Sequence, residues 1–222
     1  MIEIKNMKAI HDAEYIFELI SQGEHENLDF KFLISDSRKI ARSIAAFANN
    51  MGGTLLIGVK DNGNVAGVRT EEEFYMIEQA AEMYCKPSQK VEQTLYNVQG
   101  KFVLKVDIAP SEKLVMAQDD NAVWQTYYRV KDENIQVPKK VAKIWRKNSA
   151  NQSFISFSDT ESKMLSLISV NEKVPMDDMP ILLHISAKTA ENIISRLYSL
   201  GIISLIYDAD CWVVKAKELP EY

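Results

Sequence analysis

An unbroken apolar run, Thr54 to Val59, constrains this chain more than any other segment. The glycine pair Gly52-Gly53 precedes it, and the turn-forming residues 61–64 follow it. A short apolar run between two such breaks predicts a buried strand. Apolar residues spaced three and four apart predict a helix over residues 37–50, immediately before the glycines. A helix that turns directly into a buried strand indicates a mixed α/β domain.

The remaining elements of this domain follow from the same two periodicities. Helical spacing predicts helices over residues 11–22 and 71–84, and alternation of apolar and charged residues predicts a strand at 28–32. Pro138 is expected to open a short helix over 139–147. Turn residues separate a further series of expected strands, at 65–68, 91–98, 102–108, 113–118 and 123–130.

A second, smaller domain is expected after residue 148. The stretch 148–153 is small and polar, without periodicity, and is typical of a linker. Three helices and a terminal hairpin then predict a winged helix, with strands at 202–207 and 211–216. The domain division is therefore 1–148 for the α/β domain, 149–157 for the linker and 158–222 for the winged helix.

Composition restricts the partners and the compartment. The net charge is −5, and acidic residues outnumber basic ones after residue 150, so nucleic-acid contact requires a local basic patch. Cys85 and Cys211 fall in different expected domains, so we expect no disulfide and a reducing, cytoplasmic setting. No apolar run is long enough to span a bilayer, and no membrane association is expected.

Four segments, taken in order, resemble the Schlafen-type AlbA domain. They are Glu24 with the Leu28–Lys31 sequence LDFK, the IAAFAN of 44–49, the GGTLLIGV of 52–59, and the Asp61, Gly63 and VAGV pattern that ends at Val68. The sequence TYYRV at 126–130 is similar to that family's closing strand, so the resemblance covers roughly residues 20–135. It implies a nucleic-acid-binding α/β fold, often found in bacterial regulators beside a helix-turn-helix or winged-helix module.

The resemblance also suggests a site of carboxylates. In the animal Schlafen branch, two such lobes clamp RNA and three carboxylates form an endoribonuclease site, which the resemblance carries onto Glu24, Asp29 and Asp61. Oxygen ligands of this kind suit Mg²⁺ or Mn²⁺. The chain departs from the family in having Asp at 29, where many members have Glu, and Lys60, where an acid is common.

The residue pattern by itself allows two interpretations of Glu24, Asp29 and Asp61. Asp29 and Lys31 lie two apart and share a strand face, where Lys31 would balance phosphate charge. Glu26 can replace Glu24 as a ligand. The alternative is that Asp29 and Lys31 form the polar face of an edge strand and that Asp61 begins a turn.

Two helices carry candidate nucleic-acid contacts. Positions on one side of the helix after Pro138 suit phosphate contacts, or form an ordinary solvated face: Lys139, Lys143, Arg146 and Lys147. The third helix of the expected winged helix presents Lys188, Asn192 and Arg196, which suit guanine, adenine or phosphate. Acidic residues flank this surface, which instead favours a protein partner.

These observations predict a nucleic-acid-binding protein, a DNA-binding transcriptional regulator of bacterial type, acting on DNA or RNA as a homodimer. The alternatives are a metal-dependent endoribonuclease that uses Mg²⁺ or Mn²⁺, and an adaptor that binds a protein through the acidic winged helix.

Overall fold

The computed structural model describes residues 7–146 and 157–217 of the chain. Contacts between residues divide the chain into two units, Met1–Val137 and Pro138–Tyr222. Within the described ranges, no helix is both long enough and apolar enough to cross a bilayer.

A four-stranded mixed sheet forms the centre of the first unit. The strand order is β1-β2-β5-β4; β1 and β2 are parallel, and the other neighbours are antiparallel. The side chains of Leu55, Leu56 and Ile57 are fully buried, so the apolar run does form an internal strand, as predicted. The four strands are β1 (Leu28–Lys31), β2 (Gly53–Ile57), β4 (Val91–Val98) and β5 (Lys101–Ile108).

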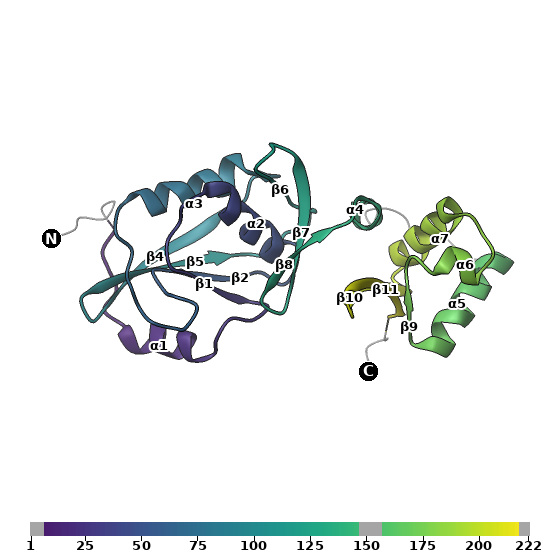
Figure 1. Ribbon diagram of the computed structural model, residues 1–222, viewed down its shortest axis with the longest axis horizontal. Helices are drawn as coiled ribbons and strands as arrows, with labels where there is room; N and C mark the ends of the chain where they lie inside the picture. Colours follow the sequence, from purple (N-terminus) through teal and green to yellow (C-terminus); the bar gives the residue numbers. More distant parts are fainter. Residues whose placement is uncertain (1–6, 147–156, 218–222) are drawn as a thin grey trace. The chain divides into compact units, whose positions relative to one another are not determined.

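Helices cover both faces of this sheet (Figure 1). The helix α1 (Ala13–Ser21) lies on one face, and α2 (Ser37–Ala48) and α3 (Glu72–Met83) lie on the other. The side chain of Asp36 accepts a hydrogen bond from the Arg38 N–H at 2.8 Å and so caps the first turn of α2.

The glycine pair makes the tight turn from α2 into β2 that the sequence predicted. Gly52 has a positive φ of 79°, which favours glycine. A Cβ at Gly53 would lie 2.5 Å from the Phe47 ring, so no larger residue fits without a shift. The glycines therefore allow the end of α2 to pack closely against the start of β2.

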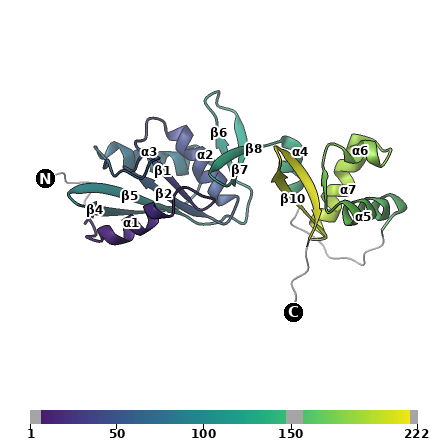
Figure 2. The same ribbon diagram turned by 60° about the horizontal axis from the view of Figure 1, so that its bottom comes forward.

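A second, antiparallel sheet packs on the side of α2 away from the first (Figures 1 and 2). Its order is β3-β6-β7-β8, and α2 is nearly all buried because it contacts both sheets. The Asn49 side chain joins helix and sheet, since its Nδ2 donates to the carbonyls of Val115 and Tyr127, each at 2.8 Å. The strands are β3 (Cys85–Lys86), β6 (Met116–Gln118), β7 (Trp124–Val130) and β8 (Glu133–Val137).

Three features of the first unit differ from the sequence prediction. Residues 65–68 form no strand; a single bridge joins Val59 to Val65. Gly58 and Gly67 both have positive φ, and the N–H of Gly67 bonds to the carbonyl of Gly58, which folds this segment into a compact loop. In addition, neither β3 nor β8 was expected.

The second unit contains four helices and a three-stranded sheet among its described residues. The order along the chain is helix, helix, strand, helix, helix, strand, strand, and the sheet order is β10-β11-β9. Ser158 and Glu161 form a capping box at the start of α5, a motif whose Ser-x-x-Glu spacing is visible in the sequence. The elements are α4 (Lys139–Arg146), α5 (Asp159–Asn171), β9 (Lys173–Pro175), α6 (Met179–Leu182), α7 (Ala187–Ser199), β10 (Ile203–Asp208) and β11 (Cys211–Ala216).

The helix α4 groups with the second unit, whereas the sequence analysis assigned residues up to 148 to the first domain. The physical reason is packing: α4 lies against α7, and the rings of Trp145 and Trp212 meet edge to face at 5.2 Å. Of the expected linker at 149–157, only Phe157 falls within the described residues. The winged-helix assignment stays a prediction.

Candidate nucleic-acid interface

A buried charge cluster surrounds Asp29 on β1. The residue is 3% exposed, and its Oδ1 accepts a hydrogen bond from Arg129 Nη2 at 3.2 Å. Its Oδ2 lies 2.6 Å from Lys31 Nζ and forms an ion pair with it. Lys31 Nζ also donates a hydrogen bond to the carbonyl of Phe30. An unpaired carboxylate at this depth would be costly, so the two cations offset the desolvation cost of burying this side chain.

Arg129 of β7 is the centre of this cluster, with 1% of its surface exposed. Besides Asp29, its guanidinium donates to the carbonyl of His25 at 3.3 Å and to Asn134 Oδ1 at 3.2 Å. It also lies 5.1 Å from the centre of the Phe47 ring. Arg129 therefore holds the second sheet, α2 and the segment before β1 together.

Glu24 lies beside Asp29, as the sequence analysis expected. Its Oε1 accepts a hydrogen bond from the Phe30 N–H at 2.8 Å, which fixes it at the start of β1. Burial raises the pKa of Glu24, and a hydrogen bond between its carboxyl group and that of Asp29 raises it further. The two carboxyl groups thus form a close pair in which the pKa of Glu24 is raised above its ordinary value.

Asp61 does not complete a three-carboxylate site with this pair. It is exposed, in the turn that the Gly63 N–H closes onto the Lys60 carbonyl at 2.7 Å. Across the described residues, no group of three or more His, Cys, Asp and Glu side chains could hold a metal ion. Because Arg129 and Lys31 already occupy both oxygens of Asp29, the residues present do not fit a Mg²⁺ or Mn²⁺ site.

A cluster of two cations around Phe32, here called the Phe32 cluster, lies close by in the chain. Lys60 Nζ is 5.2 Å and Arg69 Cζ 5.5 Å from the centre of the Phe32 ring. Phe32 directly follows β1, and Lys60 follows β2 by three residues. Because β1 and β2 are parallel, their carboxyl ends lie at the same end of the sheet, which brings the two residues close together. Within the described part of the chain, neither cation forms an ion pair with an acidic side chain.

The sequence analysis missed Phe32 and Arg69, and it treated Lys60 only as a departure from the family pattern. A signal was present, because Phe32 ends one predicted strand and Lys60 directly follows another. Lys31, which was predicted to contact phosphate, is instead engaged with Asp29 and one third exposed.

The predicted basic contacts of α4 are partly neutralised by acidic side chains of the second unit. Lys143 pairs with Glu191 of α7 at 2.9 Å, and Lys140 pairs with Asp177. Lys139 and Arg146 are exposed, whereas Lys147 lies outside the described residues. The helix thus presents fewer free cations than its sequence indicates.

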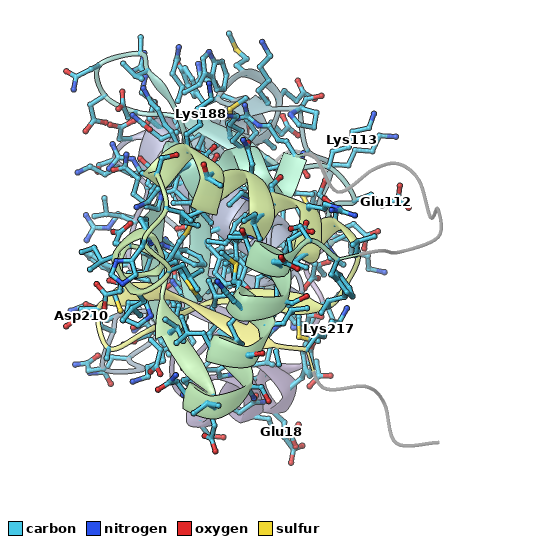
Figure 3. All side chains as sticks on the ribbon, turned by 90° about the vertical axis from the view of Figure 1, so that its right-hand side faces the viewer. Glu18, Glu112, Lys113, Lys188, Asp210 and Lys217 are labelled. Atoms are coloured by element: carbon cyan, nitrogen blue, oxygen red, sulfur yellow. The ribbon has the colours of Figure 1, made fainter. Side chains whose placement is uncertain are left out.

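On α7, Lys188 and Asn192 are exposed, as predicted, while Arg196 pairs with Glu161 at 2.6 Å. Ser186 caps the helix by accepting a hydrogen bond from the Thr189 N–H at 3.0 Å. Figure 3 shows the Lys188 side chain at the surface and well away from Asp210 of the terminal hairpin. The exposed face of α7 therefore offers one cation and one amide close to each other.

Comparison with known proteins gives one family match. The family model described as Schlafen, AlbA_2 matches residues 24–138, more than half of the chain. No curated protein matches the chain significantly.

Two solved structures are similar at low identity. One is the crystal structure of the DIP2311 protein from Corynebacterium diphtheriae, with 16% identity and a TM-score of 0.47. The match covers 90% of this chain and 37% of that one, so this chain spans little more than a third of its length. The other is the solution NMR structure of the N-terminal domain of a putative ATP-dependent DNA helicase RecG-related protein from Nitrosomonas europaea. It has 17% identity and a TM-score of 0.36, and the match covers 68% of this chain and 97% of that one.

The matched residues include β1 with Glu24 and Asp29, the Gly52-Gly53 turn, and the strand that carries Arg129. These are the segments on which the resemblance in the sequence was based. The chain belongs to the Schlafen AlbA_2 family.

Proposed function

We propose that this chain binds nucleic acid and acts as a DNA-binding regulator, with the first unit contacting phosphates and the second unit adding specificity. The observation that carries the proposal is the Phe32 cluster, where Lys60 and Arg69 flank one ring without an acidic partner among the described residues. In a chain of net charge −5, cations left uncompensated at one edge of a sheet are suited to an anionic ligand.

The chemistry of these side chains fits a phosphate backbone. A lysine and an arginine provide diffuse, salt-sensitive attraction to phosphates, and arginine can also bind two phosphate oxygens at once. The Phe32 ring restricts both cations, which lowers the conformational entropy lost when they bind.

The second unit supports the proposal that this chain recognises particular bases in DNA. Its order from α5 to β11 is that expected of a winged helix, in which α7 would be the recognition helix. Lys188 suits guanine or phosphate, and Asn192 suits adenine. A homodimer would give two such helices and raise the affinity of a small interface through avidity.

One observation favours a second function, the protein adaptor. Ile181 and Leu182 of α6 are 72% and 50% exposed, and large apolar side chains exposed side by side often mark protein interfaces. The endoribonuclease hypothesis receives no comparable support, because Asp29 is engaged by two cations.

The test is the affinity for labelled duplex DNA, measured by fluorescence anisotropy over a range of salt concentrations. Replacing both cluster cations (K60E with R69E) should weaken binding by about tenfold or more and reduce the salt slope by roughly two. The matched control is K113E, an exposed lysine outside the cluster (Figure 3), which should change affinity little. If wild-type protein binds no nucleic acid at low salt, the proposal fails and the adaptor becomes the leading function.

A further inference from the structure

Two half-buried aromatic residues share one backbone row of the second sheet and its margin, and the Tyr84 side chain also packs against the core of the first unit. Tyr84 immediately precedes β3, and Trp124 begins β7. The N–H of Gln118 bonds to the Tyr84 carbonyl at 3.0 Å, and Gln118 is also the paired residue of Trp124. The backbones of the two aromatic residues are therefore separated by two strand spacings, roughly 10 Å.

Each ring has a cation over it. Arg38 Cζ of α2 lies 4.7 Å from the centre of the Tyr84 ring, and Lys86 Nζ of β3 lies 5.8 Å from that of Trp124. Lys86 is exposed, and no ion pair involving Arg38 or Lys86 occurs among the described residues. We call Arg38, Tyr84, Lys86 and Trp124 the aromatic row.

Two exposed apolar residues are sequence neighbours of the aromatic residues in the row. Met83 and Val123, each directly before one of the aromatic residues, are 63% and 44% exposed. Asp120 at the tip of the β6–β7 hairpin pairs with Arg42 of α2 at 2.9 Å, so its charge is compensated. The aromatic row thus combines two half-buried rings with two cations, contributed by α2, β3, the residue before β3 and the start of β7.

This surface suits bases more than phosphates alone. Duplex DNA presents stacked bases whose faces are hidden, whereas a single strand can place its bases on aromatic rings and arginine planes. Lys86 would then contact the backbone between stacked bases. An acidic peptide would satisfy the cations but would leave the two ring faces without a matching partner.

We infer that the aromatic row binds single-stranded nucleic acid by stacking bases on Tyr84 and Trp124, using residues that the duplex contacts proposed above do not use. The inference rests on the proposed nucleic-acid binding and adds a separate surface to it. It applies to DNA and RNA alike, since every base has a face that can stack.

The experiment compares full-length variants in binding to labelled oligothymidylate, oligouridylate, an abasic oligonucleotide and duplex DNA. Replacing Trp124 by leucine should weaken binding to both single strands by at least about fivefold, while phenylalanine at 124 should retain most of it. Replacing Lys86 by alanine should reduce the salt slope by about one, and K113A is its control. Affinity for the duplex should stay within about twofold in every variant, which also reports that the variants fold.

The results separate the two proposals. If the leucine variant binds single strands as well as the wild type, or the abasic strand binds equally well, stacking is wrong although duplex binding stands. If polyglutamate displaces the oligonucleotide as effectively as unlabelled oligothymidylate, the row is an electrostatic surface for acidic chains and the inference is wrong. Absence of all binding in the wild type would remove the proposed function itself.

Discussion

The Nη2 atom of Arg129 lies 3.2 Å from Oδ1 of Asp29, and the side chains are only 1% and 4% exposed. Removing one member of a buried ion pair leaves the other charge without its partner. We therefore expect R129A to lower the free energy of unfolding by about 3–5 kcal/mol, measured by chemical denaturation. Arg42 pairs with exposed Asp120 at the surface and keeps about a quarter of its own side chain exposed, so R42A should cost less than about 1 kcal/mol.

A double variant tests the pairing itself. Combining R129M with D29L removes both charges, so the double variant should be more stable than R129M alone. Equal or greater loss in the double variant would mean that Arg129 acts mainly through His25 and Asn134 and not through Asp29.

Divalent metal should not stabilise the first unit. Asp29 has both oxygens engaged by protein cations, and Asp61 is exposed in a separate turn. Millimolar Mn²⁺ or EDTA should leave the melting temperature unchanged, because a ligand stabilises only a protein that binds it. A rise in melting temperature with Mn²⁺ that disappears in D29N would restore the three-carboxylate hypothesis.

The paired carboxyl groups should produce a pH dependence. Burial and the hydrogen bond with Asp29 raise the pKa of Glu24 above its ordinary value of 4.5. The folded chain then binds this proton more tightly than the unfolded chain, so the contribution of Glu24 to stability is fully present below pH 4.5 and is lost as pH rises through the folded-state pKa. Denaturation curves across this range should show the loss as a change in the stability difference between wild type and E24Q, because the other carboxyl groups titrate in both proteins.

A matched substitution gives the control for this prediction. Glu26 is exposed two residues away, so E26Q should keep the wild-type pH dependence. The same slope in E24Q and wild type would assign the decline to another group.

The position of α4 leads to a prediction about fragments. Because Trp145 packs on Trp212 and Lys143 pairs with Glu191, residues 138–222 should unfold at a higher temperature than residues 149–222. Differential scanning calorimetry of both fragments measures this difference. Identical melting temperatures would show that α4 adds nothing to the second unit.

Local elements were predictable because their signals are local. The run from Thr54 to Val59, its glycines and the cap at Ser158 all specify structure through neighbours within a few residues. The helical period of α4 was also read correctly, but a period reveals only that a face is buried and not which unit buries it. Its assignment depended on Trp212, far along the chain.

The site was predictable only in part, for the same reason. Glu24 and Asp29 are close in sequence, and their proximity was expected. The partner of Asp29 lies 100 residues away on β7, and no local pattern indicates that an arginine there will be buried. The Phe32 cluster also depends on a loop conformation that carries Arg69 back toward β1, which the expected strand at 65–68 did not provide.

The dependence of Asp29 on Arg129 has a consequence for synthesis. A chain leaves the ribosome from its N-terminus, so β1, α2 and β2 emerge long before β7. Until then Asp29 has Lys31 nearby but lacks the guanidinium that joins it to the second sheet. The early strands can pair, but the Asp29–Arg129 ion pair forms only after β7 has been synthesised. Folding of the first unit is therefore completed only when nearly all of that unit has been translated.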